Sequence, residues 1–262
     1  MAEPLLEIDG LTKRFGGVIA ADAITLAIPA GELHAVIGPN GAGKTTLIGL
    51  LTGEITPEAG AVRFDGSDIT RLAVDRRNRL GLARSFQITS LFLDVTALDN
   101  VALAVQAHRG HSFRFWDDAR REDELRDPAQ AALERVGLGP RAAMRVDRLS
   151  HGEHRQLEIA MALATQPRLL LLDEPMAGMG PEESARMVAL LRELKGSTTI
   201  LLIEHDMEAV FALADRITVL VYGRVIASGE PAVIRADPAV RQAYLGEGEG
   251  GGRNGRRKGR HD

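Results

Sequence analysis

One glycine-rich segment constrains this chain more than any other part of the sequence. Residues 38–46 read GPNGAGKTT, with one apolar run before them at residues 33–37 and another after them at residues 47–51. A strand, a loop and a helix in that order are the context that the G-x-x-x-x-G-K-[ST] pattern requires. In such a loop, backbone N–H groups turn toward phosphate oxygens and the helix start adds partial positive charge. The sequence therefore predicts a loop that binds a nucleoside triphosphate.

Two side chains of this loop have specific predicted roles. We expect Lys44 to reach the β- and γ-phosphates and the Thr45 hydroxyl to bind Mg²⁺. The other predicted nucleotide-binding residues of the loop are Gly38, Pro39, Asn40, Gly41, Ala42, Gly43 and Thr46.

A second constellation follows residues 169–172, a run of four leucines that ends in Asp173 and Glu174. A buried strand delivers such residues to the carboxyl edge of a sheet, where open α/β sheets bind ligands. There Asp173 can hold Mg²⁺ partly through water, and Glu174 can polarise the attacking water. A solvated acidic turn is the alternative, and the phosphate loop upstream favours the catalytic interpretation.

Composition excludes several classes of protein. A net charge of −4 argues against binding nucleic acid, and no apolar run approaches the roughly 18 residues that cross a bilayer. We expect no secretory signal, because the first residues carry neither a basic nor a long apolar segment. The absence of cysteine excludes disulfides and thiolate metal sites and fits a reducing cytoplasm.

Hydrophobic patterning predicts an α/β fold. Residues 5–28 and 61–66 are β-rich, residues 96–166 are helical, and strands at residues 169–172, 198–203 and 217–221 alternate with helices such as residues 182–194. This order predicts a parallel sheet core with an inserted helical block. Residues 246–262 carry five basic and three acidic groups and no apolar residue. We expect this tail to be disordered, either simply solvated or loosely attracted to anionic lipid.

Three further elements mean little individually. Ser150, His151, Gly152 and Glu153 precede an apolar helical stretch, so they predict either an ordinary helix cap or a second anion site. Gln87 follows a strand-like run, and His205 follows residues 199–204. Each of these two side chains alone is more typical of a structural residue.

In this order, however, the five motifs resemble the nucleotide-binding subunits of ABC transporters. The resemblance implies a P-loop (RecA-like) parallel sheet with an N-terminal antiparallel β subdomain. It places the ATPase domain at residues 1–245, with a helical subdomain inserted at about 88–165. It implies that Phe15 stacks on adenine, although a core role is an alternative, that Gln87 senses Mg²⁺, and that His205 contacts the γ-phosphate of ATP. Asp173 and Glu174 take the metal and water roles given above.

In this family the segment 150–153 caps the γ-phosphate held by a second ATPase subunit, so a dimer completes each site. His151 and Glu153 depart from the usual L-S-G-G-Q, replacing its first glycine and its glutamine. Gly180 stands where an aspartate usually communicates between the two sites, which leaves the strength of that coupling open.

The local sequences around Gln87 and His205, and those of residues 157–160 and 243–246, resemble the ATPases of branched-chain amino acid importers. The resemblance implies transmembrane permease subunits as partners, an extracytoplasmic solute-binding protein as an indirect one, and a position on the cytoplasmic face of the inner membrane. Residues 108–126 match an insertion of this branch, and its three aromatics, Phe113, Phe115 and Trp116, predict a contact surface or a small local core. Import of urea, amides or aromatic acids, lipopolysaccharide export and a soluble ABC protein acting on ribosomes or DNA are the alternatives.

Overall fold

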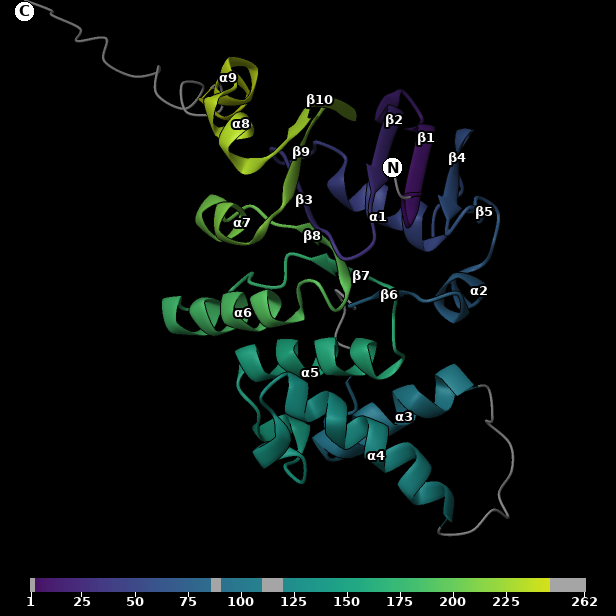
Figure 1. The fold of residues 1–262 in the computed structure, drawn as a ribbon, viewed down its shortest axis with the longest axis vertical. Helices are drawn as coiled ribbons and strands as arrows, with labels where there is room; N and C mark the ends of the chain where they lie inside the picture. The colour runs from purple at the N-terminus through teal and green to yellow at the C-terminus, as the bar shows by residue number, and fades with distance from the viewer. Residues whose placement is uncertain (1–2, 86–90, 110–119, 246–262) are drawn as a thin grey trace, which may run out of the picture.

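The computed structural model of the protein describes residues 3–85, 91–109 and 120–245. Its central sheet has six strands in the order β10-β9-β3-β8-β7-β6 (Figure 1). These strands are β3 (Leu33–Ile37), β6 (Leu82–Arg84), β7 (Leu169–Asp173), β8 (Thr199–Ile203), β9 (Arg216–Val221) and β10 (Arg224–Gly229). All neighbouring pairs are parallel except β9 and β10, which form an antiparallel hairpin at one edge.

A second sheet is antiparallel and comes from the N-terminal part of the chain. Its order is β2-β1-β4-β5, from β1 (Leu6–Phe15), β2 (Val18–Ile28), β4 (Ala59–Phe64) and β5 (Ser67–Asp68). Helix α1 (Lys44–Thr52) contributes to the apolar core between the two sheets. The phosphate loop is therefore followed directly by a helix that packs against both sheets.

Helices cover the other face of the central sheet. Between β6 and β7 the chain forms α3 (Ala97–Arg109), α4 (Arg120–Arg135), two short 3₁₀ turns (Gly139–Arg141 and Val146–Arg148) and α5 (His151–Ala164), which lie together at the bottom of Figure 1. The remaining helices are α2 (Val74–Arg79), α6 (Pro181–Leu194), α7 (Met207–Leu213), α8 (Pro231–Ala236) and α9 (Pro238–Leu245). None of the helices in the described part of the chain combines the length and the hydropathy that a membrane crossing requires.

The leucine run of β7 shows how the layers are joined. Leu169 and Leu171 pack toward α1 and the antiparallel sheet, whereas Leu170 and Leu172 pack toward the helical face. All four are fully buried, as is typical of a parallel strand that is covered on both sides. A continuous apolar run therefore reads as a central strand, and its last residue, Asp173, lies at the carboxyl edge of the sheet.

The predicted fold class is confirmed, with a parallel core, an antiparallel N-terminal sheet and inserted helices. The sequence analysis did not predict β10. Residues 224–228 of this strand alternate between exposed and half-buried, whereas every residue of β7 is buried, because β10 lies at the edge of the described sheet. Such a half-exposed strand has no continuous apolar run to identify it.

Candidate active site

The phosphate loop connects the end of β3 to the start of α1. Its last residue, Gly43, has a φ of 102° and caps the helix without a side-chain hydrogen bond. A Cβ atom on Gly43 would lie 2.2 Å from the carbonyl oxygen of Ala20, so the loop backbone lies directly against β2. The first N–H groups of α1 therefore have no side-chain cap, an arrangement that suits phosphate binding.

Lys44 lies along the inside of this loop. Its Nζ donates to the carbonyl oxygen of Gly38 at 2.6 Å and to that of Pro39 at 3.1 Å, and the residue is 8% exposed. Thr45, the next residue, is exposed on the first turn of α1. Of the other predicted loop residues, Asn40 and Gly41 are exposed, Ala42 is buried and Thr46 is half-buried.

Asp173 ends β7 and is buried close to a guanidinium. Its Oδ2 lies 3.2 Å from Nη2 of Arg84, whose Nη1 also contacts Glu54 at 2.8 Å. Burial raises the pKa of Asp173, and the positive charges of Arg84 and Lys44 partly offset that rise. The sequence analysis did not single out Arg84, because a lone arginine near a strand end carries no recognisable signal.

Glu174 has an unusual backbone conformation for a residue with a side chain. Its φ is 48°, and its N–H donates to the carbonyl oxygen of Ile203 at 2.9 Å. Its Oε1 lies 3.8 Å from Nδ1 of His205, and both side chains are partly exposed. A left-handed conformation costs a non-glycine residue on the order of 1–2 kcal/mol and is often found at functional sites. The ends of β7 and β8 thus bring these two predicted residues together.

A buried carboxylate, Glu204, connects the two segments that carry this pair. Its Oε1 accepts the N–H of Met176 at 2.9 Å, and its Oε2 accepts the N–H of His205 at 3.1 Å. Burial raises the pKa of Glu204, while these backbone donors oppose the rise. The side chain therefore ties the turn after Glu174 to the start of the segment that carries His205. The sequence analysis assigned Glu204 no role, although an acidic residue directly after a buried strand was the signal available.

The segment 150–153 forms the start of α5 in a separate cluster. Ser150 and Glu153 make a capping box, in which the Ser150 Oγ accepts the N–H of Glu153 at 3.2 Å and the Glu153 Oε2 accepts that of Ser150 at 2.8 Å. The Ser150 hydroxyl also donates to Glu183 of α6 at 3.4 Å. A Cβ on Gly152 would lie 2.7 Å from the same Glu183 carboxylate, so a larger residue would displace it. The predicted helix cap is present, and α6 supplies its neighbour.

Two residues that depart from the usual family patterns, His151 of the segment 150–153 and Gly180, lie near the contact between α5 and α6. The ring nitrogen Nε2 of His151 lies 3.3 Å from the carbonyl oxygen of Ala177, which connects the start of α5 to the loop after β7. Gly180 caps α6, and its N–H donates to Glu183 at 3.4 Å. None of the hydrogen bonds or ion pairs found among the described residues joins Ser150 to Lys44, Glu174 or His205.

The two remaining candidates have different outcomes. Phe15 ends β1, is 50% exposed and has the Nζ of Lys13 at 5.5 Å from its ring centroid. The core role considered for it is therefore wrong. Gln87, the three aromatics of the insertion and the tail 246–262 lie outside the described residues.

Comparison with known proteins decides the family. The family model described as "ABC transporter" matches residues 21–177, more than half of the chain. This chain belongs to the ABC transporter family. A second model, "Branched-chain amino acid ATP-binding cassette transporter", matches residues 224–250 of this cassette.

Individual relatives agree with the family models. The branched-chain amino acid transport ATP-binding protein BraF of Pseudomonas aeruginosa is 41% identical to this cassette, with 94% of the chain and 100% of the relative covered. LivG of Escherichia coli K12, which has the same description, is 39% identical with the same coverage. Neither relative favours the export alternative.

Solved structures support the fold. The ADP conformation of MJ1267, described as an ATP-binding cassette of an ABC transporter, superposes with a TM-score of 0.82 at 28% identity, covering 94% of this chain and all of that one. The dimeric cassette MJ0796 superposes with a TM-score of 0.73 at 25% identity, covering 86% and 98%. The chain is an ABC-type ATPase cassette that binds a nucleotide.

Proposed function

We propose that this cassette hydrolyses ATP to drive the import of branched-chain amino acids. The observation that carries the hydrolytic role is the pairing of Glu174 with His205, 3.8 Å apart at the edge of the sheet that also holds the phosphate loop. The substrate class rests on BraF and LivG, both described as branched-chain amino acid transport proteins. The cassette itself has no role in selecting the solute, which the permease and the solute-binding protein recognise.

Each residue of the site has one task in this proposal. The phosphate loop and Lys44 bind the phosphates, and Glu174 accepts a proton from the attacking water. His205 contacts the γ-phosphate and, together with Glu204, keeps the carboxylate of Glu174 oriented toward it. The half-exposed Phe15 stacks on the adenine. Gln87 senses the metal ion.

Mg²⁺ fits the oxygen donors that this site offers. The described residues contain no group of three carboxylate, histidine or cysteine side chains that could hold a metal by themselves. Asp173 offers a buried carboxylate and Thr45 an exposed hydroxyl, and Mg²⁺ is usually held by one or two protein oxygens plus substrate phosphates and water. When bound there, the ion neutralises charge on the β- and γ-phosphates.

A second ATPase subunit completes the site in this proposal. Among the described residues, no hydrogen bond joins Ser150 or Gly152 to Lys44 or Glu174, so in this proposal they meet the γ-phosphate held by a second copy or by a sister ATPase. MJ0796, a cassette of the same fold, is described as dimeric. Closure of the dimer on ATP and its opening after hydrolysis then supply the motion for transport.

The permease is proposed to dock in an apolar groove of about 530 Å³ between α2, β6, α3 and α5. Three exposed apolar side chains on this groove are Val74, Phe92 and Leu103. Exposed apolar patches of this kind mark interaction surfaces. In this proposal, docking there holds the cassette at the cytoplasmic face of the inner membrane.

Two substitutions test the hydrolytic mechanism. Glu174→Gln is expected to keep ATP affinity while turnover falls by about 10²–10⁴-fold, the usual contribution of a positioned base. Lys44→Ala is expected to weaken ATP binding instead. Glu193→Gln, at an exposed position of α6, is the matched control. Normal turnover by Glu174→Gln in a steady-state ATPase assay would remove that residue from its role.

The transported solute requires a separate experiment. The cassette is co-expressed with candidate permease and binding-protein subunits and purified as a complex. Uptake into vesicles is then compared for leucine, urea, an amide and an aromatic acid. ATP-dependent uptake of leucine but not of the other solutes is the expected result, and uptake of another solute alone would refute the substrate class.

A further inference from the structure

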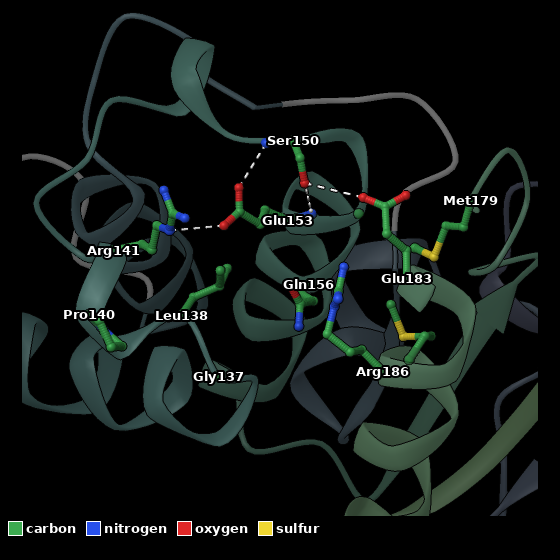
Figure 2. A pocket seen from close by; sticks show the side chains of 12 residues that line it. Gly137, Leu138, Pro140, Arg141, Ser150, Glu153, Gln156, Met179, Glu183 and Arg186 are labelled. Atoms are coloured by element: carbon green, nitrogen blue, oxygen red, sulfur yellow. Dashed lines mark hydrogen bonds and ion pairs between the residues drawn. The ribbon is translucent and has the colours of Figure 1, made fainter. Parts of the chain in front are cut away.

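Glu153 is held by contacts on both sides of its carboxylate (Figure 2). Its Oε2 accepts the N–H of Ser150 at 2.8 Å. Its Oε1 lies 3.0 Å from Nε of Arg141, the last residue of the first of the two 3₁₀ turns between α4 and α5. The capping box therefore holds the negative charge of Glu153 next to Ser150.

A carboxylate is an unfavourable group at this place if Ser150 meets a γ-phosphate. Glutamine caps a helix start as well as glutamate does, because either side chain can accept the backbone N–H. Glu153 therefore adds a negative charge that the capping geometry does not need. That charge would repel an incoming phosphate at short range.

We propose that Arg141 is a positioning residue that neutralises Glu153 and so lets Ser150 accept the nucleotide of a second copy. The inference rests on the proposed function, because it assumes that two cassettes close around ATP. Arg141 touches neither the nucleotide nor the hydroxyl of Ser150 in this arrangement. It acts through Glu153, whose charge it cancels and whose carboxylate it orients.

The other charged groups that face Ser150 balance one another. These groups are Glu183 and Arg186, which both come from α6 and line one pocket of about 540 Å³ together with Ser150. The Glu183 carboxylate lies 3.4 Å from the Ser150 Oγ, and Figure 2 shows Arg186 extending from α6 toward the same space. With Arg141 and Glu153 the pocket holds two carboxylates and two guanidinium groups. Removal of Arg141 leaves a net charge of −1 beside Ser150.

The test measures dimerisation in a background that retains ATP. All variants carry Glu174→Gln, and the ATP concentration that gives half-maximal dimer is measured by light scattering. We expect the required ATP concentration to rise in the order E153Q, parent, R141M, with the double variant R141M/E153Q close to the parent. The required ATP concentration follows the net charge of the Arg141–Glu153 pair, and each unit of charge changes that concentration on the order of fivefold to tenfold at low salt.

Arg145→Met is the matched control. The side chains of Arg145 and Arg141 are both 47% exposed, but Arg145 pairs with Asp94 and Asp147 instead of Glu153. We expect R145M to dimerise at the parent's ATP concentration. Added salt should narrow the difference between R141M and the parent, because it screens exposed charges. Thermal unfolding of each variant checks that the fold is retained.

The outcomes separate the inference from the function on which it rests. A parent that stays monomeric in saturating ATP would overturn the ATP-closed dimer and, with it, this inference. A parent that dimerises while R141M behaves identically would overturn the role of Arg141 alone. A defect in R141M that E153Q does not correct would also refute it, because a purely structural arginine gives that result.

Discussion

Arg77 is a buried arginine for which the described residues show no ion pair with a carboxylate, and its removal should destabilise the protein severely. The guanidinium donates to the carbonyl oxygens of Leu50 and Leu51 at 2.8 and 2.7 Å, of Thr70 at 2.8 Å and of Leu72 at 2.9 Å. Arg77 is 1% exposed, and burial lowers its pKa. Two of the four acceptors belong to the last turn of α1, where a positive charge also interacts favourably with the helix dipole.

The expected loss follows from two opposing terms. Arg77→Met keeps much of the apolar volume but takes the guanidinium donor from two buried and two partly buried carbonyl groups, at about 1–3 kcal/mol each. The same change removes a buried charge, which relieves a desolvation cost of several kcal/mol. At about 2 kcal/mol per carbonyl, the balance is a loss of roughly 3–5 kcal/mol in the free energy of unfolding.

Urea unfolding followed by circular dichroism measures this loss. Arg79→Met on the same helix is the control, because Arg79 forms an ion pair with Asp75 in which both side chains are 58% exposed. We expect that control to change the free energy of unfolding by less than about 0.5 kcal/mol. In a thermal scan, R77M should melt roughly 6–20 °C below the parent. Equal urea midpoints for R77M and R79M would refute the assignment of Arg77 as the anchor of α1.

Two further predictions concern the loop and the helical region. Gly43→Ala should weaken ATP binding at least tenfold, because the added Cβ would meet the Ala20 backbone. Gly41→Ala, whose Cβ would have no atom within 4 Å, should weaken ATP binding less in the same titration. Equal effects of the two substitutions would contradict the close approach of Gly43 to Ala20. Burial raises the pKa of Glu158, so the folded chain releases that proton at a higher pH than the unfolded chain does, and stability falls as pH rises from about 4.5 through the raised pKa. Glu158→Gln keeps an acceptor for Arg155 and should therefore gain stability over the parent as pH rises from 5 to 8. A difference in the free energy of unfolding between the two proteins that stays constant over that pH range, measured by urea unfolding, would refute the pH dependence assigned to Glu158.

The sequence predicted the parts of the site whose positions follow from strand ends. Asp173 and His205 each follow an apolar run, and parallel strands deliver such residues to one edge of a sheet. The pairing of β7 with β8 then places Glu174 near His205 without any further information. The sequence therefore predicts that these residues lie at one edge of the sheet, the structure shows that Glu174 and His205 lie close together, and their catalytic roles stay a prediction.

Other parts depend on contacts that no local pattern encodes. Arg77 lies within a run of polar residues, RRNR, that reads as a solvated surface, yet it is buried because α1 and the residues before α2 surround it. Arg141 and Glu153 are separated by the second 3₁₀ turn and the first residues of α5. Local propensity cannot predict such pairs, since tertiary packing decides which long side chains meet.

The two halves of the proposed site are held by different physical interactions, and this difference has a consequence for how they respond to salt. The phosphate loop is fixed by backbone against backbone, with Gly43 against Ala20, and Lys44 lies inside it. The start of α5 is fixed by partly exposed charges, of which Arg141 and Glu153 are the central pair. Salt screens exposed charges over about 10 Å at 0.1 M but leaves steric contacts unchanged. Salt therefore weakens the charged contacts at the start of α5 but leaves the backbone contacts of the phosphate loop unchanged. As a result, the affinity of a single cassette for ATP should depend less on ionic strength than the closure of two cassettes around ATP does.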